Sequence, residues 1–85
     1  MSYNITDYTK AKAKQLGVRV VPSKKKGKKV DVVKDGVIIA SIGDIRYTDF
    51  ASTGDKEQRR RYKLRHEKTR KIKNTPSYWA DQLLW

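Results

Sequence analysis

The chain has 85 residues, no cysteine and a formal net charge of +12, from 21 Lys and Arg against 9 Asp and Glu. A chain of this length forms one small domain at most and buries only roughly 60–65% of its unfolded surface. Disulfides are excluded, and no apolar run approaches the roughly 20 residues of a membrane-spanning helix. The excess of positive charge favours a polyanionic partner, because neutralisation relieves self-repulsion.

The charge is segregated along the chain. Residues 10–29 contain nine cations and no acid, and residues 56–73 contain ten cations and two glutamates. Between them, residues 30–55 contain five aspartates and two cations. Two basic segments therefore flank a slightly acidic centre, and no linker divides residues 1–85, which we interpret as a single small basic domain.

The first predicted elements are a helix and a short strand. The helix follows Thr6, an N-cap residue, and stops at Gly17. The β-branched residues in 18–21 predict a strand, which Pro22 ends or marks as an edge. The segment 22–29, PSKKKGKK, is predicted to be a mobile basic loop.

The acidic centre contains the strongest strand signal, VDVVKDGVIIASIG at residues 30–43. Asp35-Gly36 supplies the positive φ angles of a two-residue type I′ turn between β-branched strands. Such a turn predicts three cross-strand pairs, namely Lys34 with Val37, Val33 with Ile38 and Val32 with Ile39.

Two more helices are predicted in the second half. A long basic helix runs from about 55 to 71, with Asp55 and Glu57 at its N-terminal end, where the helix dipole favours acids. Asn74-Thr75-Pro76 predicts the start of a short apolar helix over about 76–85. The sequence therefore predicts a small α+β domain with an N-terminal helix, an antiparallel β-hairpin or three-stranded sheet, a long basic helix and a short apolar C-terminal helix.

The predicted basic helix has no wide apolar stripe, so it is either solvated or docked on an anionic partner. The pattern matches no helix-turn-helix, zinc-finger, RNA-recognition or KH motif, which indicates polyanion binding without sequence reading. One side of the helix carries Gln58, Tyr62, Arg65, His66 and Thr69. The candidate nucleic-acid contacts are Arg59, Arg60, Arg61, Tyr62, Lys63, Arg65, His66, Arg70 and Lys71 on the helix and Lys24, Lys25, Lys26, Lys28 and Lys29 in the loop.

The single histidine, His66, is a weak candidate for catalysis. A general base needs a carboxylate that orients it and a nucleophile nearby, and no known catalytic motif occurs. Asp44, Asp49 and Asp55 are the residues that could gather Mg²⁺, but loop aspartates more often form turns and caps. We expect no catalytic residue, no metal and no cofactor, and a packing or hydrogen-bonding role for His66.

The C-terminal segment YWADQLLW is unusually apolar. It either closes the core against the hairpin or anchors the chain in a partner subunit or capsid lattice. The residues that would serve as core or partner anchors are Tyr78, Trp79, Leu83, Leu84 and Trp85.

Four stretches together resemble a small, basic, uncharacterised protein family of large double-stranded DNA viruses and some tailed phages: DYTKAKAKQLGV, KDGVIIASIG, QRRRYKLRHEKTR and TPSYWADQLLW. The resemblance covers nearly the whole chain, although residues 45–58 are shorter than the middle segment of that family. The positions that carry the C-terminal half of the resemblance are Arg59, Arg60, Arg61, Tyr62, Arg65, His66, Pro76, Tyr78, Trp79, Ala80, Asp81, Leu83, Leu84 and Trp85.

The viral setting that this resemblance implies gives two hypotheses. The first is a non-enzymatic protein of the virion or of replication that binds nucleic acid, DNA before RNA, through Lys/Arg–phosphate contacts without sequence preference. The second is a minor structural or cement protein of a viral capsid that binds acidic shell proteins or other virion proteins through its basic face and its C-terminal aromatics. Both place the protein in a virion or in the cytoplasm or nucleus of a host cell, and the N-terminus lacks the apolar region of a secretory signal peptide.

Overall fold

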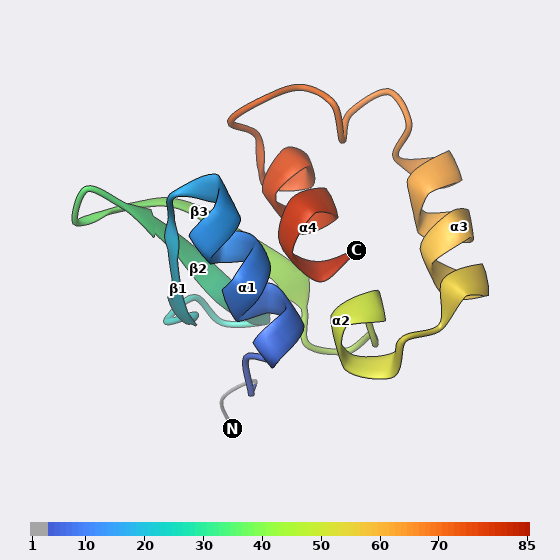
Figure 1. The fold of residues 1–85 in the computed structure, drawn as a ribbon, viewed down its shortest axis with the longest axis horizontal. Helices are drawn as coiled ribbons and strands as arrows, with labels where there is room; N and C mark the ends of the chain where they lie inside the picture. Colours follow the sequence, from blue (N-terminus) through green and yellow to red (C-terminus); the bar gives the residue numbers. More distant parts are fainter. Residues whose placement is uncertain (1–3) are drawn as a thin grey trace.

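A three-stranded antiparallel sheet covered by helices organises residues 4–85, the part of the chain that the computed structural model describes (Figure 1). The sheet has the order β1-β2-β3. The predicted α+β class is confirmed. Of the two predicted alternatives, a hairpin or a three-stranded sheet, the structure has the three-stranded sheet. The elements in chain order are α1 (Asp7–Leu16), β1 (Arg19–Pro22), β2 (Lys28–Lys34), β3 (Val37–Asp44), α2 (Phe50–Thr53), α3 (Lys56–Arg65) and α4 (Pro76–Leu84).

Helix α1 has the two caps that the sequence predicts. The Thr6 hydroxyl accepts a hydrogen bond from the Thr9 amide at 3.3 Å, and Gly17 ends the helix in the left-handed conformation with φ 73°. The Thr9 hydroxyl, fully buried, donates to the Leu83 carbonyl oxygen at 2.8 Å. This bond joins α1 to α4, so the two ends of the described chain pack together over the sheet.

The hairpin between β2 and β3 has the predicted turn but not the whole predicted register. Asp35 and Gly36 have φ angles of 53° and 78°, as a type I′ turn requires. The pairs Lys34–Val37 and Val33–Ile38 are confirmed. The predicted pair of Val32 with Ile39 is wrong, because a bulge inserts Ile39 as an extra residue and Val32 faces Ala40.

The predicted basic loop is shorter than residues 22–29, since Pro22 ends β1 and Lys28 begins β2. Its start is fixed to the sheet by Asp31, a buried carboxylate on β2. Asp31 accepts hydrogen bonds from the hydroxyls of Ser23 at 2.6 Å and Ser41 at 2.7 Å, and from the Lys24 amide at 3.3 Å. Burial acts to raise the pKa of Asp31, but these hydrogen bonds outweigh it and the pKa lies below its ordinary value.

The core lies between one face of the sheet and helices α1 and α4. Val20, Val32 and Ala40 are aligned across the three strands on this face. The C-terminal segment closes the core: Trp79, Leu83, Leu84 and Trp85 are each 8% exposed or less, and Tyr78 packs against them. Full burial of each such side chain contributes roughly 1.5–3 kcal/mol. These residues therefore pack in the core of the protein itself, the first of the two roles predicted for them.

Helix α3 starts as predicted and ends early. Asp55 caps it by accepting from the amides of Glu57 and Gln58. The helix stops at Arg65 rather than at about Lys71, with His66 as its C-cap. The following residues form turns that bring the chain back to α4, which packs on β3 (Figure 1). The predicted helix was too long because a straight continuation would carry the chain away from that core.

Between β3 and α3, where no helix or strand was predicted, the chain forms the short helix α2. Asp49 is its N-cap and Gly54 its C-cap, with φ 68°. In Figure 1, α2 lies below α4 and leads into α3 at the right-hand edge of the molecule. Crossing a lipid bilayer needs a longer and more apolar helix than any found between residues 4 and 85.

Gly43 is required where β3 approaches α4. Its φ is 79°, and a Cβ atom there would lie 2.9 Å from Leu84 Cδ1 and 2.9 Å from Lys29 Cδ. We expect Gly43→Ala to lower the free energy of unfolding by about 1–3 kcal/mol more than Gly17→Ala, because only Gly43 adds overpacking to the left-handed strain. Gly17 has a φ of 73° and no atom within 4 Å of its added Cβ. Urea unfolding measures both variants, and equal losses would contradict the close packing.

Candidate functional site

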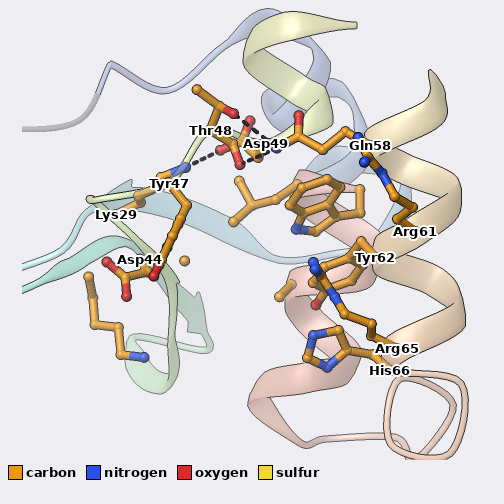
Figure 2. Close-up of a pocket in the computed structure, with 15 residues that line it drawn as sticks. Lys29, Asp44, Tyr47, Thr48, Asp49, Gln58, Arg61, Tyr62, Arg65 and His66 are labelled. Atoms are coloured by element: carbon orange, nitrogen blue, oxygen red, sulfur yellow. Dashed lines mark hydrogen bonds and ion pairs between the residues drawn. The ribbon is translucent and has the colours of Figure 1, made fainter. Parts of the chain in front are cut away.

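A cleft of about 720 Å³ lies between the end of the sheet and α3 (Figure 2). One wall comes from β2, β3 and the segment that follows β3, and the other wall comes from α3. Helix α4 and Trp85 supply the rest of the lining. The fifteen lining residues are Lys28, Lys29, Gly43, Asp44, Tyr47, Thr48, Asp49, Gln58, Arg61, Tyr62, Arg65, His66, Ala80, Leu84 and Trp85.

The α3 wall is one face of the helix. Tyr62, Arg65 and His66 belong to the face that helical spacing predicts from Gln58, and the structure brings these four side chains together at the cleft. Arg61 adds to this face at the i+3 position from Gln58. Thr69, which was predicted on the same face, lies beyond the end of the helix.

An aromatic column stands on this wall. The Tyr62 ring stacks on Trp85 with ring centroids 4.3 Å apart and an interplanar angle of 4°, and His66 stacks on Tyr62 at 4.3 Å and 30°. Tyr62 and Trp85 are each 8% exposed, while His66 is only half-buried. Burial, with a smaller effect from the Asp81 charge, raises the pKa of Tyr62 to about 12, so its hydroxyl is protonated at neutral pH. His66 has a packing contact in this column, one of its two predicted roles.

A buried ion pair supports the opposite wall. Lys29 Nζ lies 2.6 Å from Asp49 Oδ2, and the two side chains are 5% and 1% exposed. Asp49 also accepts the Ser52 amide at 2.8 Å as the N-cap of α2. Lys29, one of the predicted phosphate contacts, has its charge buried and paired with Asp49 inside the protein.

The other acid at the cleft is also engaged by a cation. Arg46 binds Asp44 with its Nε and one terminal nitrogen, and the hydrogen bond from Arg46 lowers the pKa of Asp44 to about 2. Asp49 and Asp55 are helix N-caps, as expected for loop aspartates. Residues 4–85 contain no group of three His, Cys, Asp or Glu side chains that could hold a metal ion.

Arg61 and Arg65 differ from the other arginines of this region. Both are exposed, and neither side chain makes a hydrogen bond or an ion pair with any residue in the range 4–85. Lys28 lines the cleft from the sheet side, opposite Asp44 in the strand register. Lys24, Lys25 and Lys26 are exposed in the loop that precedes it. The cleft therefore carries positive charge that the protein itself leaves available.

The remaining predicted contacts have other partners within the fold. Arg59 lies over the Phe50 ring, 4.7 Å from its centroid, and Arg60 pairs with Glu57 at 2.6 Å. The three other cations form ion pairs with acids of the same region: Lys63 with Asp81 at 2.8 Å, Arg70 with Glu67 at 2.7 Å and with Asp81 at 3.7 Å, and Lys71 with Glu67 at 2.6 Å. Of these contacts, Arg59 with Phe50 and the pairs of Lys63 and Arg70 with Asp81 join α3 and the returning segment to other elements, while the Arg60–Glu57 and Lys71–Glu67 pairs are local and solvated.

Sequence reasoning missed Tyr47 and Thr48 on the sheet-side wall. Tyr47, 66% exposed, and Thr48 lie in a segment without periodicity that could have marked them. Thr48 is tied to α3, since the Gln58 amide donates to its hydroxyl at 2.9 Å and to its carbonyl oxygen at 3.2 Å. Gln58 itself was placed on the correct helix face, but its partner ten residues earlier follows only from the fold.

One comparison with known proteins gave a match. A model of a family of unknown function (DUF5754) matches residues 18–66, from the start of the sheet to the C-cap of α3. Twelve of the fifteen cleft residues lie in this range, and Ala80, Leu84 and Trp85 lie after it. No curated protein and no solved structure matched the chain.

The buried ion pair predicts a strong effect on stability. Lys29→Met keeps much of the side-chain volume but leaves Asp49 buried without its cation, so we expect a loss of about 3–5 kcal/mol in the free energy of unfolding. Lys71→Met is the matched control, because its side chain is 65% exposed and its ion pair is solvated. Urea unfolding of the two variants compares them, and a loss for Lys29→Met no larger than for Lys71→Met would contradict the importance of this pair.

Proposed function

The chain belongs to the family of unknown function DUF5754, and from its own surface we propose that it binds nucleic acid through contacts of Lys and Arg with phosphate, without reading the base sequence. The observation that carries the proposal is the pair Arg61 and Arg65 on one face of α3, whose exposed side chains form no hydrogen bond or ion pair among residues 4–85. The charge of Arg61 contributes to the lowered pKa of Glu57, but Glu57 forms its ion pair with Arg60. The formal net charge of +12 supports a polyanionic ligand.

The distribution of acids makes these two arginines unusual. Like charges at i and i+4 on a helix repel each other, so leaving both unpaired costs stability. The nearby acids Glu57, Glu67 and Asp81 are engaged with other cations of the same region. A phosphate group would relieve the repulsion, because the planar guanidinium donates two parallel hydrogen bonds to its oxygens.

Phosphate contacts position a nucleic acid but carry no sequence information. The exposed cations Lys24, Lys25 and Lys26 extend the positive surface from the cleft along the adjoining loop. DNA is the first ligand to test, because the resemblance noted above is to proteins of double-stranded DNA viruses. On the same ground, we place the protein in a virion or in the interior of a host cell.

The proposal is non-enzymatic. His66 stacks on Tyr62, and the carboxylates of Asp44 and Asp49 at the cleft are bound by Arg46 and Lys29. The alternative of a capsid protein held by its C-terminal aromatics has weaker support, because those side chains lie in the core of the protein itself.

Removing the two available arginines should weaken DNA binding and its salt dependence. We expect Arg61→Gln/Arg65→Gln to lower the slope of log K against log salt by about two units, roughly one for each arginine that no longer neutralises a phosphate. Fluorescence anisotropy of labelled DNA across a salt series measures this slope.

The matched control is Lys10→Gln/Lys14→Gln, which removes the same charge from exposed positions of α1. It should reduce the slope by clearly less than the arginine variant. Equal slopes for the two variants would reject a localised site. Binding of poly-glutamate as tight as that of DNA would reject phosphate recognition in favour of an acidic protein partner.

A further inference from the structure

The cleft has the size of a ligand pocket and not of a surface for a double helix. Its volume of about 720 Å³ falls within the roughly 300–1,000 Å³ of small-molecule and cofactor sites. In a duplex the bases are paired and stacked inside, so a base enters a protein pocket only when its nucleotide is unpaired.

Cations and aromatic rings form two adjacent rows on the cleft wall. Arg61 and Arg65 are one helical turn apart, and Tyr62 and His66 follow them by one residue with the same spacing. Figure 2 shows these four side chains on the α3 side of the cleft. A phosphate-binding row beside a stacking row is the arrangement by which proteins hold single-stranded nucleic acid.

His66 is the end of the aromatic column that remains accessible. Tyr62 is 8% exposed and contacts two rings, Trp85 in a stacked and His66 in a tilted arrangement. His66 is only half-buried and lines the cleft, so part of its side chain is accessible to a ligand. Tyr47 lies on the other wall with 66% of its surface exposed (Figure 2). The His66 ring, which packs on the buried Tyr62, is therefore a stacking partner for an aromatic base.

The column is held rigidly before any ligand arrives. Trp85 is buried in the core, the Lys63–Asp81 ion pair spans 2.8 Å between α3 and α4, and Gln58 is bonded to Thr48 across the top of the cleft. A platform that is already ordered loses little conformational entropy on binding, which favours affinity.

From this arrangement we propose that the cleft binds an unpaired nucleotide of a single-stranded nucleic acid, with the phosphate at Arg61 and Arg65 and the base stacked on His66. The inference rests on the proposed function and adds that single strands are preferred to duplexes. Its essential claim is that a base, and not only the phosphate backbone, contacts the protein.

Three labelled probes of equal length, about ten nucleotides, test this claim within the roughly 4–16 nucleotides that a small domain occupies. They are an oligothymidylate, an abasic strand with the same phosphates, and a blunt duplex. At one salt concentration, the oligothymidylate should bind the full chain about tenfold more tightly than either of the others, because one stacked base contributes that much.

Variants of the chain assign this difference to His66. His66→Ala should abolish the advantage of the oligothymidylate over the abasic strand while leaving binding of the abasic strand unchanged, and His66→Phe should retain the advantage. Leu64→Ala is the control for general effects on α3, since Leu64 is 62% exposed and does not line the cleft.

The outcomes separate this inference from the proposed function. Equal binding of the thymidylate and abasic strands, or tighter binding of the duplex, would overturn the stacked nucleotide and leave phosphate binding intact. An advantage that persists in His66→Ala would also overturn it, because the base would then contact another part of the protein. Absence of binding to all three probes at low salt would reject both proposals.

Discussion

Helix α3 depends on one buried aromatic contact for its position. Tyr62 is its buried residue, and it stacks on Trp85 in the core. The remaining attachments are polar or cationic: Lys63 to Asp81, Arg59 over Phe50 and Gln58 to Thr48. A helix this polar has little hydrophobic reason to dock. The cleft wall therefore exists because the C-terminal segment supplies both the ring and the carboxylate that receive it.

The few acids of the chain divide its cations into those held in ion pairs and those left exposed without one. Asp49 neutralises Lys29 inside the protein. Asp81, which is 5% exposed, forms ion pairs with both Lys63 and Arg70. These buried or half-buried pairs fix the fold, and breaking one would leave an uncompensated charge. Because the acids near α3 are engaged with other cations, a bound anion would relieve the repulsion between Arg61 and Arg65. A bound polyanion would then stabilise the folded state as well as occupy the site.

The local features were predictable because their causes lie within a few residues. The Thr6 cap, the Asp35-Gly36 turn and the Asp55 cap each need only neighbouring backbone groups. The burial of Lys29 was missed because its partner Asp49 lies twenty residues away. The bulge at Ile39 is local, but the two-residue turn signal predicts only a regular register beyond it. The same holds for the site: periodicity found the α3 face, but not the opposite wall with Tyr47 and Thr48.

The arginine triplet 59–61 shows why charge density alone does not locate such a site. The three side chains are identical and adjacent, but on a helix they point in directions about 100° apart, since there are 3.6 residues per turn. Arg59 meets the Phe50 ring, Arg60 meets Glu57, and Arg61 reaches the cleft. Packing thus leaves one of the three at the cleft without an ion pair, while the other two contact groups of the fold. The capacity of a small basic protein to bind phosphate is better judged from the cations its fold leaves unpaired than from its net charge.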